Sequence, residues 1–129
     1  MMARVLIVDD DLTVREVLGQ TLEDAGLEVD CADGGRAALS AMCRATAEGK
    51  PYDAMVLDII MPDVNGWRVL EAVKANPLWN DMPVVVVSGY VTGSDDVARI
   101  SRYDGFFVEK TGNFLEVIRS ALGRLVPAA

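Results

Sequence analysis

Carboxylates, a serine and a lysine stand at the ends of short apolar runs in this sequence. Asp9 and Asp10 follow the run 5–8, Asp58 follows 54–57, Ser88 follows 84–87, and Lys110 comes shortly after 106–108. The chain has no histidine, which excludes a Ser-His-Asp triad and histidine metal ligands. Any chemistry must therefore depend on carboxylates, hydroxyls, lysines and a bound metal or cofactor.

The acidic residues predict a magnesium site. Carboxylates held close together repel one another, which raises their pKa values unless a cation neutralises them. Oxygen donors without His or Cys favour Mg²⁺, which binds one or two carboxylates and a phosphate oxygen and keeps several waters. A carboxylate can also be the nucleophile that forms an aspartyl-phosphate, while a lysine and a hydroxyl hold the phosphoryl oxygens. Catalysis would then be mostly positioning and charge neutralisation.

Most of these residues, taken singly, also have a purely structural interpretation. An aspartate after a strand often caps the next helix. Ser88 before Gly89 is typical of a turn, and a lone lysine usually lies on the solvated surface. Asp58 is harder to explain in this way, because the apolar segment 59–62 follows it and offers no helix to cap. The joint pattern, more than any one residue, indicates a functional site.

Apolar runs alternate with segments of helical period, which predicts five strands and five helices. The expected strands are 5–8, 27–32, 54–57, 84–87 and 106–108; the expected helices are one ending near Gly26, one from a cap at Asp33 to about Glu48, then 64–75, 95–102 and 114–125. This order favours an α/β fold with one parallel sheet and helices on both faces. Ligands of such sheets bind beyond the carboxyl ends of the strands, so the polar residues would gather at one edge.

Length and composition indicate one domain with its own core. The chain has 129 residues, of which 51% are hydrophobic, enough to bury a core without cross-links. We expect the domain at 1–126 and a tail or the start of a linker at 127–129. The two cysteines, Cys31 and Cys43, form no C-x-x-C pair, and we expect them to be small core thiols.

The charge of the chain limits its direct partners. The net charge is -8 and the pI about 4.4, which argues against nucleic acid and anionic membranes, because both attract cationic proteins. No signal peptide is apparent, and no apolar run approaches the ~20 residues of a membrane span. A cytoplasmic protein is expected.

The motifs resemble those of the response-regulator receiver domain of two-component signalling, over essentially the whole chain. VLIVDDD at 5–11 resembles the first strand and acidic pair, DAMVLDIIMP at 53–62 with Gly66 the phosphoacceptor strand and loop, VVVVS at 84–88 the strand ending in a switch hydroxyl, and FFVEK at 106–110 the strand with an aromatic residue and a lysine. The resemblance, closest to stand-alone chemotaxis regulators, implies a doubly wound, flavodoxin-like sheet of strand order 2-1-3-4-5.

The resemblance also implies a role for each matching residue. Asp58 would accept the phosphoryl group; Asp9, Asp10, Asp58 and the carbonyl of Ile60 would hold Mg²⁺; Lys110 would pair with the phosphoryl group; Ser88 and Phe107 would form the switch; and Asp11 would start a helix. The donor would be a phosphohistidine on a sensor histidine kinase or histidine phosphotransfer protein. Output would be protein–protein contact through the fourth helix, fifth strand and fifth helix, and the chain would catalyse only its own phosphorylation and dephosphorylation.

Three positions depart from the usual receiver pattern. Thr111 follows Lys110 where the family usually has a cis-proline, and we expect a trans bond, because a cis bond before threonine costs roughly 3–4 kcal/mol. Phe107 replaces the commoner tyrosine. Ile60 and Tyr90, two residues after Asp58 and Ser88, are large and cannot activate water. Our hypothesis is that they shield the phosphoryl group and slow its hydrolysis.

Three other functions compete with this interpretation. A phosphatase of the haloacid-dehalogenase type needs a second acid two residues after the nucleophile, where this chain has Ile60. A flavin or nucleotide binder needs a phosphate-binding loop after the first strand, but acids occupy 9–11 and no G-x-x-x-x-G-K occurs. A pseudo-receiver would keep the fold without the chemistry, and the complete set of acids, hydroxyl and lysine argues against it.

Overall fold

The five strands and five helices alternate along the chain. The computed structural model describes residues 2–61, 63–89, 94–103 and 105–126. The elements are β1 (Arg4–Val8), α1 (Leu12–Asp24), β2 (Glu28–Ala32), α2 (Gly35–Ala47), β3 (Ala54–Asp58), α3 (Gly66–Ala75), β4 (Val84–Ser88), α4 (Ser94–Arg102), β5 (Phe106–Glu109) and α5 (Phe114–Leu125). Each expected element is present, and the bounds differ by a few residues at most.

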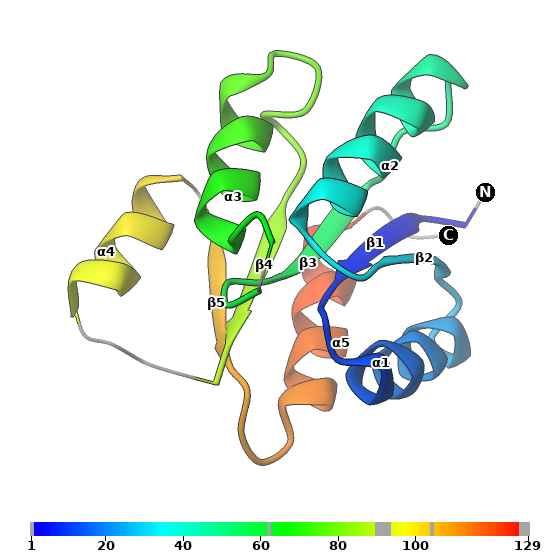
Figure 1. Ribbon diagram of the computed structural model, residues 1–129. Coiled ribbons are helices and arrows are strands. Elements are labelled where there is room, and N and C mark those ends of the chain that lie inside the picture. Colours follow the sequence, from blue (N-terminus) through cyan, green and yellow to red (C-terminus); the bar gives the residue numbers. More distant parts are fainter. Residues whose placement is uncertain (1, 62, 90–93, 104, 127–129) are drawn as a thin grey trace.

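The strands form one parallel sheet in the order β2-β1-β3-β4-β5. The predicted strand order is therefore confirmed. Helices α1 and α5 lie on one side of the sheet, and α2, α3 and α4 lie on the other (Figure 1). Because all strands are parallel, their carboxyl ends share one edge, which is where the polar residues of the sequence patterns fall.

The sheet separates two apolar layers. Alternate residues of a strand point to opposite faces, so neighbours in sequence enter different layers. Val85 packs in the layer of α1 and α5, whereas Val86 packs in the layer of α2, α3 and α4. All five residues of β3 and of β4 are buried, as expected for central strands covered on both faces.

Capping side chains and glycines fix where several helices begin and end. The Asp11 side chain accepts a hydrogen bond from the Val14 amide at the start of α1, which confirms the expected helix-start role. The chain leaves α1 through Gly26 at φ 90°, a left-handed conformation that glycine adopts without strain. At the end of α3, Asn76 is extended, as expected for a residue that precedes a proline.

Two expected helix starts were wrong. The N-cap of α2 is Gly34 and not Asp33, and because glycine has no side chain it cannot cap the helix itself. Helix α3 begins at Gly66 and not at Val64, because the Asn65 side chain caps it by accepting from the Arg68 amide. For α2, the distant residue Asp63 supplies the cap.

The prediction that both cysteines are core thiols was also wrong. Cys31 and Cys43 are both exposed. Cys31 lies on β2, an edge strand in which Ala32 is the buried residue. Cys43 lies on α2 between Met42 and Arg44, on the side of the helix opposite the buried alanines. An apolar composition alone therefore did not reveal which face each thiol takes.

Candidate functional site

Three polar side chains are buried in the part of the chain that the structure describes, and all three were predicted site residues. Asp9 is 4% exposed, Asp58 6% and Ser88 5%. Asp58 and Ser88 are the last residues of β3 and β4, and Asp9 directly follows β1. Burying a carboxylate is costly unless charge or hydrogen bonds compensate it. Their shared position at the carboxyl edge of the sheet therefore points to a functional site.

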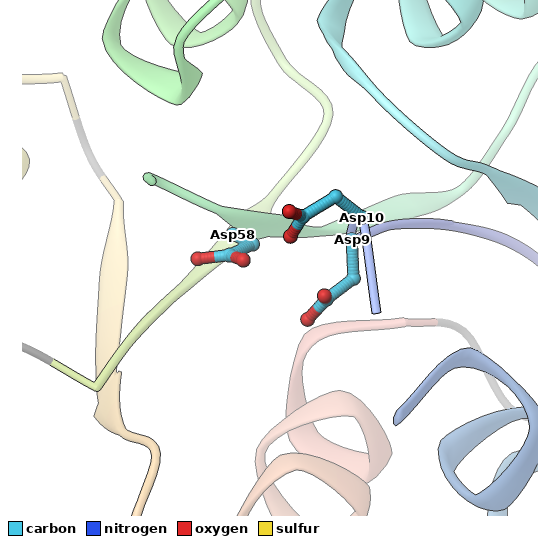
Figure 2. A group of neighbouring side chains, drawn as sticks. All are labelled: Asp9, Asp10 and Asp58. Atoms are coloured by element: carbon cyan, nitrogen blue, oxygen red, sulfur yellow. The ribbon is translucent and has the colours of Figure 1, made fainter. Parts of the chain in front are cut away.

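Asp9, Asp10 and Asp58 form an acidic cluster. The pairing of Val8 with Leu57 places the residue after β1 beside the end of β3. Each of the three acids offers a carboxylate oxygen, and these oxygens all lie within 4.8 Å of one another (Figure 2). Asp10 is exposed while the other two are buried, so the cluster opens to solvent on one side.

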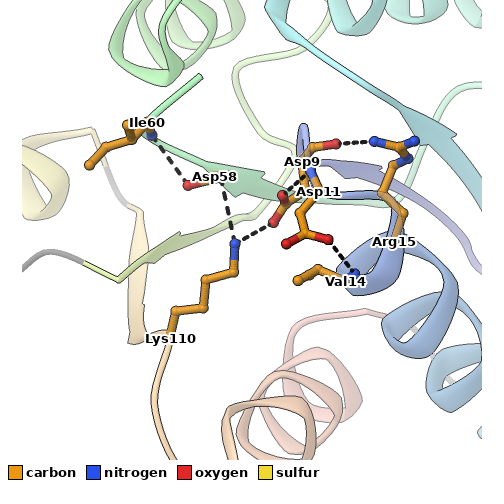
Figure 3. A network of polar contacts seen from close by, with 7 residues as sticks. All are labelled: Asp9, Asp11, Val14, Arg15, Asp58, Ile60 and Lys110. Atoms are coloured by element: carbon orange, nitrogen blue, oxygen red, sulfur yellow. Dashed lines mark hydrogen bonds and ion pairs between the residues drawn. The ribbon is translucent and has the colours of Figure 1, made fainter. Parts of the chain in front are cut away.

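Lys110 reaches into this cluster from the end of β5. Its Nζ lies 2.8 Å from Oδ2 of Asp9 and 3.7 Å from Oδ2 of Asp58 (Figure 3). Its backbone amide donates to the Ser88 carbonyl at 2.9 Å, which extends the β4–β5 pairing to the lysine. The Lys110–Thr111 bond is trans, since the described residues include no cis peptide bond. The expected trans bond is therefore confirmed, and it does not prevent Lys110 from reaching the acids.

Backbone and arginine donors fix the orientation of the two buried acids. The Asp11 amide donates to Oδ1 of Asp9 at 2.9 Å, and Nη1 of Arg15 donates to the Asp9 carbonyl at 2.7 Å (Figure 3). The Ile60 amide donates to Oδ1 of Asp58 at 3.2 Å. These contacts constrain the carboxylates before any ligand binds, which is how a preorganised site is built.

The electrostatic balance at Asp58 disfavours its charged form. Burial, followed by the negative charge of Asp9, raises the pKa of Asp58 from 3.8 to about 6, although Lys110 and the Ile60 amide oppose the rise. Burial alone would lower the pKa of Lys110, but its hydrogen bond to Asp9 and the neighbouring acids raise it, so the lysine stays charged. One ammonium does not compensate the cluster of acids fully.

The acidic cluster fits a hard divalent cation. All its side-chain donors are carboxylate oxygens, and Mg²⁺ prefers such ligands. A divalent charge would also supply the compensation that Lys110 leaves incomplete. The chemistry of the donor set and the raised pKa of Asp58 thus both indicate that this cluster suits a divalent cation such as Mg²⁺.

The remaining predicted residues differ in their burial and in how they contact the acids. Ile60 meets the cluster through its backbone, and its side chain is 59% exposed. Phe107 is paired with Val86 on β5 and is half-buried against the layer of α2, α3 and α4. Ser88 is paired with Glu109 in the β4–β5 register. Tyr90 lies outside the described residues.

The role of one residue near the site, Asp63, was not predicted from the sequence. Oδ1 of Asp63 accepts from the Gly35 amide at 3.1 Å, and Oδ2 accepts from the Arg36 amide at 3.3 Å. Asp63 therefore caps α2 from the segment that follows β3. The only sequence signal was indirect, since the glycine pair at 34–35 provides no capping side chain for a well-defined helix.

The sequence matches a known family over most of its length. The model of the response regulator receiver domain matches residues 5–119. The chain belongs to this family. Receiver domains are phosphoacceptor signalling switches, and the five-stranded sheet with its acidic edge has the corresponding architecture. The family assignment supports the signalling-domain interpretation.

Curated relatives include longer regulators. The chain is 32% identical over 130 residues to response regulator MprA of Mycolicibacterium vanbaalenii, covering 98% of this chain and 53% of that protein. It is 43% identical over 95 residues to transcriptional regulatory protein PrrA of Mycobacterium bovis, covering 74% of this chain and 38% of that protein. The chain spans about 36–42% of the length of three further relatives. Receiver domains of this kind thus occur within larger proteins.

Solved structures of similar length share the fold. The chemotaxis protein CheY4 of Vibrio cholerae is 28% identical, with a TM-score of 0.82 and coverage of 98% of this chain and 100% of that one. The response regulator TrrA of Thermotoga maritima, solved in complex with Mg²⁺ and BeF, is 28% identical with a TM-score of 0.79, covering 97% and 100%. The likeness extends over essentially all of this chain.

Proposed function

We propose that Asp58 is the phosphoacceptor of this receiver domain. The observation that carries the proposal is its burial at the end of β3, next to Asp9 and within 3.7 Å of the Lys110 ammonium. A buried carboxylate close to a cation is positioned to attack a phosphorus atom while the lysine stabilises the charge that the phosphoryl oxygens carry. Ser88, buried at the end of β4, would bond to the same phosphoryl group.

The donor is a phosphohistidine of a sensor histidine kinase or histidine phosphotransfer protein. A carboxylate oxygen of Asp58 forms the new O–P bond and the P–N bond of the donor breaks. The electron pair returns to the imidazole nitrogen, which takes up a proton. The absence of histidine from residues 1–129 agrees with a donor histidine that lies outside this sequence. The chain acts only on its own phosphorylation state.

Asp9, Asp10, Asp58 and the backbone carbonyl of Ile60 would hold Mg²⁺. The related TrrA was solved with Mg²⁺ and BeF, and the three acids here provide the oxygen donors for the same ion. When bound, Mg²⁺ neutralises negative charge between the acids and the phosphoryl oxygens. The residues of this chain orient the carboxylate, and Lys110 supplies the second positive charge.

The output is protein–protein contact through α4, β5 and α5. Phosphorylation would draw Ser88 inward, and Phe107 would follow as the second element of the switch. With a net charge of -8, direct contact with nucleic acid is disfavoured. The described residues include no helix long and apolar enough to cross a membrane. We place the domain at 1–126, with 127–129 as tail or linker, in the cytoplasm.

The exposed side chain of Ile60 supports the hypothesis of a slowly hydrolysed phosphoryl group. The Ile60 amide contacts Asp58 at 3.2 Å, the residue is 59% exposed, and its side chain has no group that can activate water. Ile60→Asn combined with Tyr90→Glu is expected to raise the dephosphorylation rate. An unchanged rate in the double variant, measured on the isolated phosphoprotein, would remove this hypothesis.

Intact mass measurement tests the phosphoacceptor directly. The protein is incubated with acetyl phosphate in Mg²⁺, and in parallel with chelator, alongside the variants Asp58→Asn and Asp24→Asn. Asp24 is an exposed acid at the far end of α1 and serves as the matched control. We expect a gain of one phosphoryl group that needs Mg²⁺, persists in Asp24→Asn and is absent from Asp58→Asn.

Two outcomes would contradict the proposal. Phosphorylation that persists in Asp58→Asn would assign the phosphoacceptor to another residue. A wild-type protein that neither binds Mg²⁺ nor gains a phosphoryl group would be a pseudo-receiver, and the loop after Lys110 would then be the first place to look for the cause.

A further inference from the structure

The segment between β3 and α3 borders the acidic site. It contains Ile60, whose amide donates to Asp58 at 3.2 Å and whose carbonyl is one of the proposed magnesium ligands. Ile59 and Met61, on either side, are buried at 8% and 7% exposure. The backbone of Ile60 can hold a fixed direction only if this segment is held in place, so its anchors bear on the site.

The far end of the segment is anchored by a close backbone contact. The Gly66 amide donates to the Ile59 carbonyl at 2.8 Å. A Cβ on Gly66 would lie 2.5 Å from the Asp58 carbonyl oxygen and 2.5 Å from Cα of Ile59. Backbone atoms cannot move aside as a flexible side chain does, so the contact requires glycine.

The middle of the segment is anchored to α2 by Asp63. Its two carboxylate oxygens accept from the Gly35 and Arg36 amides, which are free donors of the first helical turn. Burial acts to raise the pKa of Asp63, but the hydrogen bonds from backbone amides, those of Arg36 and Gly35 among them, together hold it below its usual value. The negative charge also lies at the positive end of the helix dipole of α2.

Glycines at the start of α2 allow Asp63 and Val64 to approach. A Cβ on Gly34 would lie 2.7 Å from Oδ1 of Asp63, and a Cβ on Gly35 would lie 2.3 Å from the carbonyl oxygen of Val64. Gly34 has φ -176° and ψ 177°, an extended backbone that any residue adopts. A side chain at position 34 would therefore displace the Asp63 carboxylate, although the backbone conformation there does not require glycine.

We propose that Asp63 is a positioning residue of the phosphorylation site, which holds the Ile60 backbone toward Asp58 by tying the segment after β3 to the first turn of α2. The inference rests on the proposed function, because it assigns the Ile60 carbonyl to the magnesium ion. Asp63 itself does not touch the ion or the phosphoryl group. It acts through Ile60, and its loss lowers the affinity for Mg²⁺ while the acids remain intact.

Four variants separate anchoring from charge. Asp63→Ala removes both acceptors; Asp63→Asn removes the charge and keeps one acceptor oxygen; Gly34→Ala keeps the charge but displaces the carboxylate; and Asp33→Ala removes an exposed neighbouring charge that does not cap the helix. Magnesium affinity is measured by calorimetric titration of the metal-free protein with MgCl₂. Hydrogen exchange of the Gly35 and Arg36 amides reports the cap, and circular dichroism confirms folding.

We expect Asp63→Ala and Gly34→Ala to exchange both amides faster and to bind Mg²⁺ up to about 10-fold more weakly, the lower end of the loss seen when a residue bonded directly to a metal ligand is removed. Asp63→Asn should retain most of the affinity, and Asp33→Ala should match the wild type. Equal weakening in Asp63→Ala, Asp63→Asn and Asp33→Ala would overturn the inference in favour of long-range charge. Wild-type affinity in folded Asp63→Ala with faster exchange would also overturn it.

These results are distinguishable from a failure of the proposed function. If the wild type binds Mg²⁺ and gains a phosphoryl group at Asp58 while the Asp63 variants behave like it, the inference alone fails. If the wild type itself neither binds Mg²⁺ nor is phosphorylated, the proposed function fails, whatever the amides of α2 show.

Discussion

Replacing Asp58 by asparagine is expected to make the metal-free protein more stable at neutral pH. Burial and the charge of Asp9 raise the pKa of Asp58 from 3.8 to about 6, so its ionisation is disfavoured in the folded state. A rise of this size corresponds to about 3 kcal/mol at pH 7.5. Partial solvent access and the lost attraction to Lys110 reduce this figure, and we expect Asp58→Asn to gain about 1–2 kcal/mol in the free energy of unfolding.

The dependence on pH has a definite sign. Because the folded-state pKa lies above the unfolded-state value, the unfolded chain releases its proton first as the pH rises from about 4 to about 6. Over that window the wild type loses stability through Asp58, and Asp58→Asn does not. The advantage of the variant should therefore be absent near pH 4 and fully developed above pH 6.

Urea denaturation in chelator, across pH 4–8, measures this difference directly. Saturating Mg²⁺ should reverse the order of the two proteins, because a ligand at 100 times its dissociation constant stabilises the form that binds it by about 2.7 kcal/mol. The reasoning is refuted if Asp58→Asn is the less stable protein in chelator at pH 7.5, or if the difference between the two does not shrink below pH 5.

Three other substitutions test separate parts of the structure. Val86→Ala, in a fully buried strand, should cost about 2 kcal/mol of unfolding free energy through the cavity it leaves, measured by urea denaturation. Arg99→Ala removes a guanidinium 4.3 Å from the Trp67 ring centroid; tryptophan fluorescence should change while stability falls by less than about 1 kcal/mol. Lys110→Met leaves buried Asp9 without its cation, and metal-free stability should drop by about 1–2 kcal/mol. Unchanged fluorescence or unchanged denaturation midpoints would contradict these estimates.

The sequence predicted the fold and the acids well, because both follow from short-range patterns. The apolar run at 84–87 is typical of a strand covered on both faces of a parallel sheet, and parallel strands share a carboxyl edge. Once the strands were located, Asp9, Asp58 and Lys110 could be assigned to the same edge of the sheet, and the strand order was then needed to bring them together. The family resemblance added the strand order, which periodicity alone does not supply.

What the sequence did not predict depends on contacts between distant segments. The cap of α2 is supplied by Asp63, 28 residues from Gly35, and propensity at Asp33 suggested a local cap instead. The exposure of Cys31 follows from the position of β2 at the edge of the sheet, which is a property of the whole sheet. Neither feature has a signature within a window of a few residues.

The glycines that hold the segment after β3 bear on how variants and relatives of this protein should be interpreted. A side chain at Gly35 or Gly66 would meet backbone atoms at 2.3 Å and 2.5 Å, and no rotamer change could relieve either collision. A relative could therefore carry every acid, the hydroxyl and the lysine and still be inactive, because a methyl group at one of these two positions displaces the loop. Inspection of the reactive residues alone would classify such a protein as competent, so the two glycines belong among the positions by which an intact receiver is diagnosed.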